Sequence, residues 1–195
     1  YLDLRQQSEA FSGLLAYDTV ELVVGSGTSH ETVGGALVSE NYFDVLRAPL
    51  ALGRGFVAEE AQPASSFVAV LSHGFWRRRL GADPGVVGRR IELEGEMFTV
   101  VGVASEGFQG TVLRSPVDLW VPIAVFPRLS PSGEDRFYGR RSRWLRVVGR
   151  LREGISPEQA EISARTLLRH INEAFPDDRD PVDATLIPLG VAASG

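Results

Sequence analysis

The apolar positions between residues 67 and 123 form the most regular pattern in the chain, and they predict a compact run of strands and a helix. Continuous apolar stretches indicate buried strands, and strict alternation around Glu94-Gly95 indicates a β-hairpin. Ser72 has the position and chemistry of a helix N-cap. The predicted elements in this stretch are a strand (67–71), a helix (73–80), the two hairpin strands (89–94 and 97–103) and a last strand (118–123).

Further patterns flank this stretch on both sides, and the sharpest local signal of the chain is among them. Ser156 and Gln159 form a capping box, which predicts a helix that starts at Pro157. A strand, this helix and a further strand over 144–189 would make a βαβ unit with a right-handed crossover. The remaining predictions are a helix (1–15), strands (19–24 and 32–38), a short helix (40–46), a structured loop in which Arg54 pairs with Glu59 or Glu60 near the surface, an exposed linker (127–143), a strand (144–151), a helix (157–175) and a strand (182–189).

Length and composition narrow the class of protein. A chain of 195 residues can form one large domain or two small lobes. The net charge of −5 argues against a nucleic-acid partner, and the absence of Cys removes disulfides, thiolate catalysis and zinc–thiolate sites. The sequence has neither an apolar run of membrane-span length nor a recognisable signal peptide. Its opening at Tyr1 and its loop-like end at Gly195 suggest a piece of a longer protein.

The residues that could carry chemistry do not form a recognisable catalytic, cofactor-binding or metal site. Ser72-His73 lacks the Gly-x-Ser-x-Gly elbow of a hydrolase, so we interpret it as an N-cap followed by an exposed His. The other candidates have the wrong spacing or the wrong neighbours for their chemistry. They are the histidines His30, His73 and His170, the hairpin carboxylates Glu92, Glu94 and Glu96, the acidic run Asp177, Asp178 and Asp180, and the short Gly25-x-Gly27 turn.

The arginines Arg77, Arg78 and Arg79, with Arg89 and Arg90, form the most concentrated basic cluster. We interpret them as a solvated face that pairs with nearby Glu, and the alternative is a local basic patch for anionic headgroups or an acidic partner. Among the aromatic residues, we expect Phe108 to be tucked under the domain and Trp76 and Trp120 to lie in the core.

A series of short motifs, in order, resembles one known family. The motifs are Val38-Ser39-Glu40-Asn41-Tyr42-Phe43-Asp44-Val45-Leu46, Gly53-Arg54-Gly55-Phe56 with Glu59-Glu60, Val68-Ala69-Val70-Leu71-Ser72 with Phe75-Trp76, Asp83-Pro84-Gly85-Val86-Val87-Gly88-Arg89, Phe98-Thr99-Val100-Val101-Gly102-Val103 with Gly107-Phe108, Asp118-Leu119-Trp120-Val121-Pro122, and Gly149-Arg150-Leu151 with Gly154. From about Tyr1 to Phe175, the chain resembles the MacB-like periplasmic core domain of FtsX-like ABC transporter permeases. It is most similar to the branch of duplicated permeases common in acidobacteria.

The resemblance implies an α+β, two-lobed periplasmic domain between two membrane helices of a bacterial inner-membrane permease. One lobe (1–50 with 142–190) would be membrane-proximal and porter-like with βαβ units, and the other (51–141) would be an inserted lobe that contains the hairpin. Such a domain is non-catalytic, needs no cofactor, and relays ATP-driven helix motion to substrate export or to a periplasmic partner. Its implied partners are its own transmembrane helices, a separate or fused cytoplasmic ATPase, and an adaptor protein or a second permease copy.

Two other functions stay open from the residues alone. A stand-alone lipid- or peptide-binding or sensory module would use a groove between the lobes, and a deep apolar pocket with convergent polar groups would favour it. A hydrolase built on Ser72 and His73 is the third hypothesis.

Overall fold

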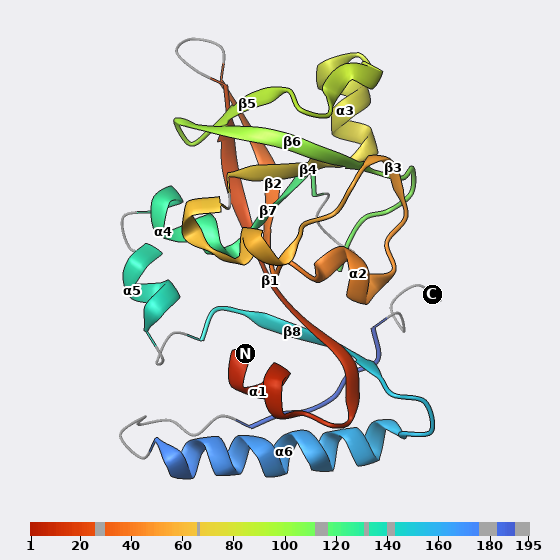
Figure 1. Cartoon of the computed structure of the whole chain (residues 1–195), viewed down its shortest axis with the longest axis vertical. Coiled ribbons are helices and arrows are strands. Elements are labelled where there is room, and N and C mark those ends of the chain that lie inside the picture. Colours follow the sequence, from red (N-terminus) through yellow and green to blue (C-terminus); the bar gives the residue numbers. More distant parts are fainter. Residues whose placement is uncertain are drawn as a thin grey trace. The chain divides into compact units, whose positions relative to one another are not determined.

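The structure is a computed structural model that describes residues 1–25, 30–65, 67–111, 117–130, 133–139, 143–175 and 183–189. It divides into two compact units: unit 1 is Tyr1–Ala16 with Arg140–Gly195, and unit 2 is Tyr17–Gly139. Helices and paired strands occur together, which confirms the α+β fold class (Figure 1). Within the described ranges, no helix is long and apolar enough to cross a membrane.

The elements, labelled as in Figure 1, follow the chain in this order. The strands are β1 (Phe11–Val24), β2 (Glu31–Val38), β3 (Leu50–Gly53), β4 (Val68–Leu71), β5 (Arg90–Leu93), β6 (Glu96–Ala104), β7 (Leu119–Pro122) and β8 (Arg146–Leu151). The α-helices are α1 (Leu2–Gln7), α2 (Tyr42–Leu46), α3 (His73–Leu80), α4 (Phe126–Leu129), α5 (Gly133–Tyr138) and α6 (Pro157–Ala174). Short 3₁₀ turns cover Ala58–Ala61, Pro63–Ser65, Pro84–Val86 and Ile123–Val125.

The strands of unit 2 are paired in a closed circuit. Residues 17–24 of β1 pair antiparallel with β2, β2 runs parallel to β7, and β7 is antiparallel to β4. Strand β4 is parallel to β6, β6 forms the predicted hairpin with β5, and Leu93 of β5 returns to Val24 of β1. Strand β3 pairs antiparallel with residues 102–104 of β6, beyond the residues that pair with β5. These strands contribute buried side chains to the core of unit 2, and Leu37, Val70, Leu71, Phe98, Leu119 and Trp120 are fully buried.

The β5–β6 hairpin illustrates why its turn could be predicted. Leu93 pairs with Glu96, so Glu94 and Gly95 are the two turn residues. Both have positive φ, 51° and 78°, as a two-residue turn with right-handed strand twist requires. Gly95 meets this requirement without strain because it has no Cβ.

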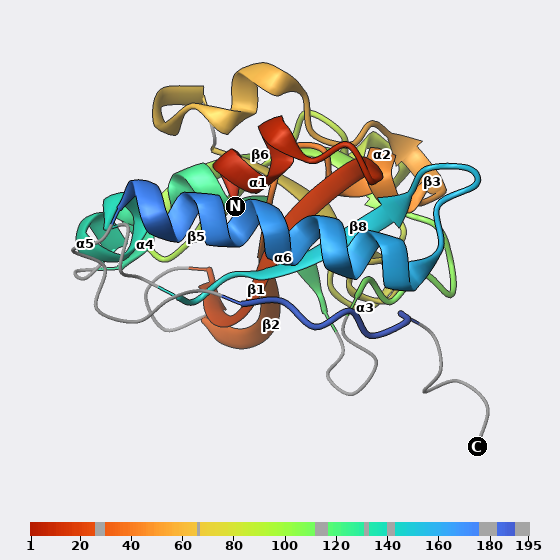
Figure 2. The ribbon, with the colours of Figure 1, turned by 90° about the horizontal axis from the view of Figure 1, so that it is seen from below.

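Unit 1 is built around helix α6, with helix α1, strand β8 and residues 11–16 of β1 beside it (Figure 2). Ser156 accepts the Gln159 N–H and the Gln159 side chain accepts the Ser156 N–H, which confirms the predicted capping box. The strands approach closely at Gly149, where a Cβ would lie 2.5 Å from a ring carbon of Phe11. The core of unit 1 consists of Ala10, Phe11, Leu14, Ala160 and Ala164, with the partly buried Tyr1, Leu4, Leu151, Ile155, Ala184 and Leu186 packed against it.

Several predicted elements are wrong. The helix over 1–15 ends at Gln7, and β1 begins at Phe11, eight residues before the predicted strand. The predicted linker over 127–143 contains helices α4 and α5 among its described residues. Residues 183–188 have no regular secondary structure and Leu189 lies in a turn. The described part of the predicted last strand is therefore not a strand, and it does not supply the second strand of the βαβ unit.

The compact units do not divide where the predicted lobes do. Compactness places residues 17–50 with the middle of the chain and gives unit 1 only Tyr1–Ala16 from the N-terminal part. The lobe assignment 1–50 with 142–190 against 51–141, as functional parts, stays a prediction.

Candidate functional site

Ser72 and His73 both make contacts within helix α3. The buried Ser72 Oγ accepts the Phe75 N–H at 3.1 Å, which caps the helix. The His73 ring packs edge-on against Trp76, with 5.4 Å between ring centroids. The N-cap interpretation of Ser72 is confirmed, whereas His73 is half-buried rather than exposed. Trp76 itself is half-buried rather than in the core, because its indole lies over the turn and donates to the Asp83 carbonyl at 2.9 Å.

Among the other candidates, two hairpin carboxylates have structural partners, and part of the list falls outside the described residues. Among the described residues, no three or more His, Asp or Glu side chains gather as a metal site would require. Glu94 accepts the Val23 N–H at 2.7 Å, and Glu96 pairs with Arg128 at 2.8 Å. The acidic run 177–180 and Gly27 lie outside the described residues.

Four of the five arginines of the basic cluster are paired with acidic side chains. The ion pairs are Arg77–Glu106 (3.6 Å), Arg78–Asp118 (2.9 Å), Arg79–Glu31 (3.6 Å) and Arg89–Asp83 (3.9 Å). The partners come from several elements of unit 2, so the positive charge is balanced locally. This arrangement favours the solvated-face interpretation over an anion-binding patch.

An aromatic cluster anchors the loop after β6. Phe108 contacts Phe43 and Trp120, with centroid distances of 6.0 and 5.5 Å, which confirms the prediction that it is tucked under the domain. The buried Tyr42 hydroxyl accepts the Thr111 N–H at 2.9 Å and lies 3.2 Å from the Thr111 Oγ1. Burial raises the pKa of Tyr42, and the Thr111 hydrogen bonds partly offset this effect. Trp120 is fully buried, as predicted.

Arg54 and Glu60 form an ion pair of a kind the sequence did not reveal. The Arg54 guanidinium donates to both carboxylate oxygens of Glu60, at 2.8 and 3.2 Å, and the Val57 N–H donates to the same carboxylate at 2.9 Å. Glu60 is only 5% exposed. The expected solvated pair is therefore a bidentate pair between a buried carboxylate and a half-exposed guanidinium, and Glu59 next to it is exposed.

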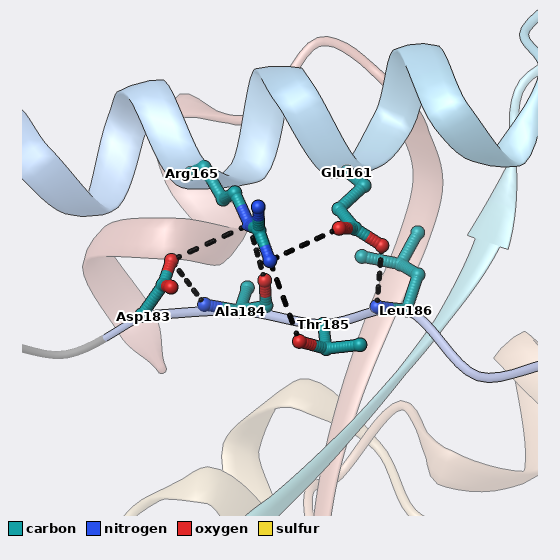
Figure 3. A network of polar contacts seen from close by, with 6 residues as sticks. All are labelled: Glu161, Arg165, Asp183, Ala184, Thr185 and Leu186. Carbon is teal, nitrogen blue, oxygen red and sulfur yellow. Dashed lines mark hydrogen bonds and ion pairs between the residues drawn. The ribbon is translucent and has the colours of Figure 1, made fainter.

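The most distinctive polar arrangement lies in unit 1, between helix α6 and residues 183–189, which we call the strap (Figure 3). Arg165 Nε donates to the Ala184 carbonyl at 2.8 Å and forms an ion pair with Asp183 at 3.5 Å. Glu161 Oε2 accepts the Leu186 N–H at 3.0 Å, and its other oxygen pairs with Arg165 at 3.2 Å. Arg165 and Glu161 are one turn apart, so both side chains reach the strap from the same face of the helix.

The strap arrangement could be found only in part from the sequence. Ala184 and Leu186 pack against the unit 1 core while Thr185 and Ile187 are exposed, so the alternation that predicted a strand is real. The hydrogen-bond partners were missed, because nothing local links Arg165 to a carbonyl 19 residues away. With hydrogen-bonded side chains from one helix face holding a separate segment, the strap on α6 is the candidate functional site.

Known proteins provide the context for this architecture. Macrolide export ATP-binding/permease protein MacB from two strains of Burkholderia pseudomallei is 27% identical over 177 residues. The match covers 90% of this chain and 24% of the relative, so the chain spans about a quarter of the length of these curated relatives.

Two solved structures share the fold. The periplasmic region of MacB from Actinobacillus actinomycetemcomitans has a TM-score of 0.66 at 18% identity, over 88% of this chain and 73% of that one. The extracellular domain of the noncanonic ABC-type transporter YknZ from Gram-positive bacteria has a TM-score of 0.62 at 15% identity, over 90% of this chain and 83% of that one.

The family follows from the sequence match. The family model for the MacB-like periplasmic core domain matches residues 2–167. Because that match covers most of the chain, the protein belongs to the MacB-like periplasmic core domain family and is an extracytoplasmic domain of an ABC-type transporter permease.

Proposed function

We propose that this domain is a non-catalytic coupling element, which transmits ATP-driven movement of permease membrane helices to substrate export or to a periplasmic partner. The family supports this role, and one structural observation carries it: segments from both ends of the chain pack into the same core. Tyr1 and Leu4 pack against the buried cluster of unit 1, and so do Ala184 and Leu186. The Tyr1 hydroxyl also donates to the Leu14 carbonyl at 3.0 Å.

In this proposal, membrane helices flank the chain on both sides. Movement of either helix then reaches unit 1 first, because both segments belong to it. Unit 2 is inserted within unit 1 in the sequence, and the chain passes between the units only at 16–17 and 139–140. Unit 1 would be the membrane-proximal, porter-like part, and unit 2 would be the part that moves substrate or partner.

The proposed partners are the permease's own transmembrane helices and a cytoplasmic ATPase, separate or fused. Outside the membrane, an adaptor protein or a second permease copy would receive the movement. The Burkholderia relatives are named for ATP binding and macrolide export, which supports ATP-driven export as the class of activity.

Distance measurements between the two units test the coupling. The chain has no Cys, so spin labels can be placed on Ile162→Cys in unit 1 and Val87→Cys in unit 2, both exposed positions. The full-length permease, with its other cysteines replaced, is reconstituted with its ATPase in nanodiscs. We expect the distance distribution to shift between the nucleotide-free and the vanadate-trapped states.

A pair within unit 2, Val57→Cys with Val87→Cys, is the matched control and should not shift. Identical distributions for the test pair in both states, with ATP hydrolysis intact, would contradict the coupling role. A full-length sequence without membrane spans on both sides of the chain would also contradict it, and would favour the stand-alone binding module.

A further inference from the structure

We infer that the strap is a detachable connection, docked on α6 in the resting permease and released when the membrane helices move. The inference deepens the proposed function, because the strap's release is tied to the ATP-driven cycle. It rests on how the strap is held, on which side chain holds it, and on how little its release would expose.

The strap's hydrogen bonds end on side chains instead of a neighbouring strand. Arg165 donates to the Ala184 carbonyl, and Glu161 accepts the Leu186 N–H. The Ala184 N–H donates to the carboxylate of its own neighbour, Asp183. A strand in a ladder is held by a continuous series of backbone bonds, which separate together. Two side-chain anchors can be lost without disturbing any strand pair.

Arg165 makes most of the side-chain contacts that hold the strap, and Glu161 provides the other anchor. Arg165 contacts Asp183, Ala184 and Thr185 of the strap, and it is held in place by Glu161 (Figure 3). Its side chain is 45% exposed, so water and salt compete for these contacts. Because water can replace these contacts at the half-exposed Arg165 side chain, the strap can be released as well as docked.

Release of the strap would leave most of its apolar surface unchanged. Ile187 is 82% exposed and Leu189 is 56% exposed in the docked state. Only Ala184 and Leu186 turn toward the core of unit 1. Pro188 lacks an N–H, which discourages this segment from pairing as a regular strand instead.

A released strap would change the mechanical length of the link. Seven extended residues span about 25 Å, at about 3.3–3.6 Å per residue. When docked, residues 183–186 are anchored on α6, so movement beyond residue 189 acts on unit 1 through these contacts. When released, the same movement is taken up by free chain.

Cysteine modification in the full-length permease tests this directly. Leu186→Cys reports docking, Ile187→Cys reports an exposed strap position, and Leu168→Cys in α6 reports whether unit 1 stays folded. The permease, with its other cysteines replaced and its ATPase present, is treated with a maleimide in membrane vesicles. We expect position 187 to react quickly in every state. Position 186 should react slowly without nucleotide and at least tenfold faster when vanadate-trapped.

Two arginine variants on α6 separate the strap from general loosening. Arg165→Met should make position 186 react at the fast rate without nucleotide, while position 168 stays slow. Arg169→Met is the matched control, because Arg169 is exposed on the same helix and forms no ion pair with another described residue. It should leave position 186 slow.

Three results would overturn the inference. The first is that position 186 still reacts slowly in the Arg165→Met variant. The second is that position 186 of the otherwise unmodified chain reacts as fast as position 187 without nucleotide. The third is that Arg165→Met speeds the reaction at position 186 but vanadate trapping does not. Each can occur while the spin-label distances still shift, so failure of the strap and failure of the coupling role are distinguishable.

Discussion

Replacing Glu60 with alanine removes a buried carboxylate that accepts hydrogen bonds from two separate parts of unit 2. Its oxygens accept hydrogen bonds from the Arg54 guanidinium at 2.8 and 3.2 Å and from the Val57 N–H at 2.9 Å. Arg54 is itself fixed to strand β6, because its backbone N–H donates to the Val101 carbonyl at 3.0 Å. The carboxylate therefore joins the 3₁₀ turn Ala58–Ala61 to the edge of the sheet.

The size of the stability loss depends on how buried the pair is and on how well each partner is hydrated once the other is removed. Breaking a fully buried ion pair costs about 3–5 kcal/mol, and a hydrogen bond to a charged group contributes about 1.5–3 kcal/mol. The Arg54 side chain is 48% exposed, so it regains water when its partner is lost. We therefore expect Glu60→Ala to lower the free energy of unfolding by about 2–3 kcal/mol, which lowers the Tm by about 4–12 °C in a chain of this length.

Glu59→Ala is the matched control, since Glu59 belongs to the same turn and is exposed. Urea denaturation of the purified domain should place it within about 0.5 kcal/mol of the unmodified protein. Arg54→Met combined with Glu60→Ala should cost less than the sum of the two single changes, because either one already breaks the pair. Equal unfolding midpoints for Glu60→Ala and Glu59→Ala, or fully additive costs with Arg54→Met, would refute the anchor.

Two further predictions concern the aromatic cluster and its loop. Trp120→Ala should lower the free energy of unfolding by about 3–5 kcal/mol, because the indole is fully buried. Trp76→Ala should lower it by only about 1–2 kcal/mol, because that ring is half-buried and makes one hydrogen bond, to the Asp83 carbonyl. Equal losses of stability in urea denaturation would contradict this difference. Gly110→Ala should lower the Tm more than Gly107→Ala does. Both glycines have positive φ, but only at Gly110 would a Cβ meet a neighbour, the Tyr42 Oη at 2.8 Å; matching thermal shifts would show that the loop does not approach Tyr42 so closely.

The elements that could be predicted from the sequence are those whose determinants are local. The capping box at Ser156 and Gln159 spans four residues, and the turn at Glu94-Gly95 lies within four consecutive residues of the hairpin. Both were predicted correctly. Ser72 likewise caps the helix that immediately follows it. Such signals are specified by backbone geometry that only a few residue types satisfy.

The elements that were missed depend on distant partners. Phe11, Leu14 and Leu15 have helical spacing, yet this stretch is a strand because it pairs with β8, more than 130 residues later in the chain, as the Ser12 Oγ bond to the Arg150 carbonyl at 3.1 Å shows. Strand β3 forms against β6 in the same way. The burial of Glu60 was missed because no sequence pattern tells a buried carboxylate from the exposed Glu59 beside it.

The strap combines both situations, and this is why its prediction was half right. Its alternation of Ala184 and Leu186 with Thr185 and Ile187 places one face against a core, and the sequence reveals that. Alternation does not reveal what bonds the backbone, and here Arg165 and Glu161 take the place of a neighbouring strand. A segment with the side-chain pattern of a strand but with side-chain anchors can dock without becoming part of the sheet. In the proposed link, this separation of packing from backbone pairing makes docking reversible, and loss of the Arg165 contacts is enough to release the strap.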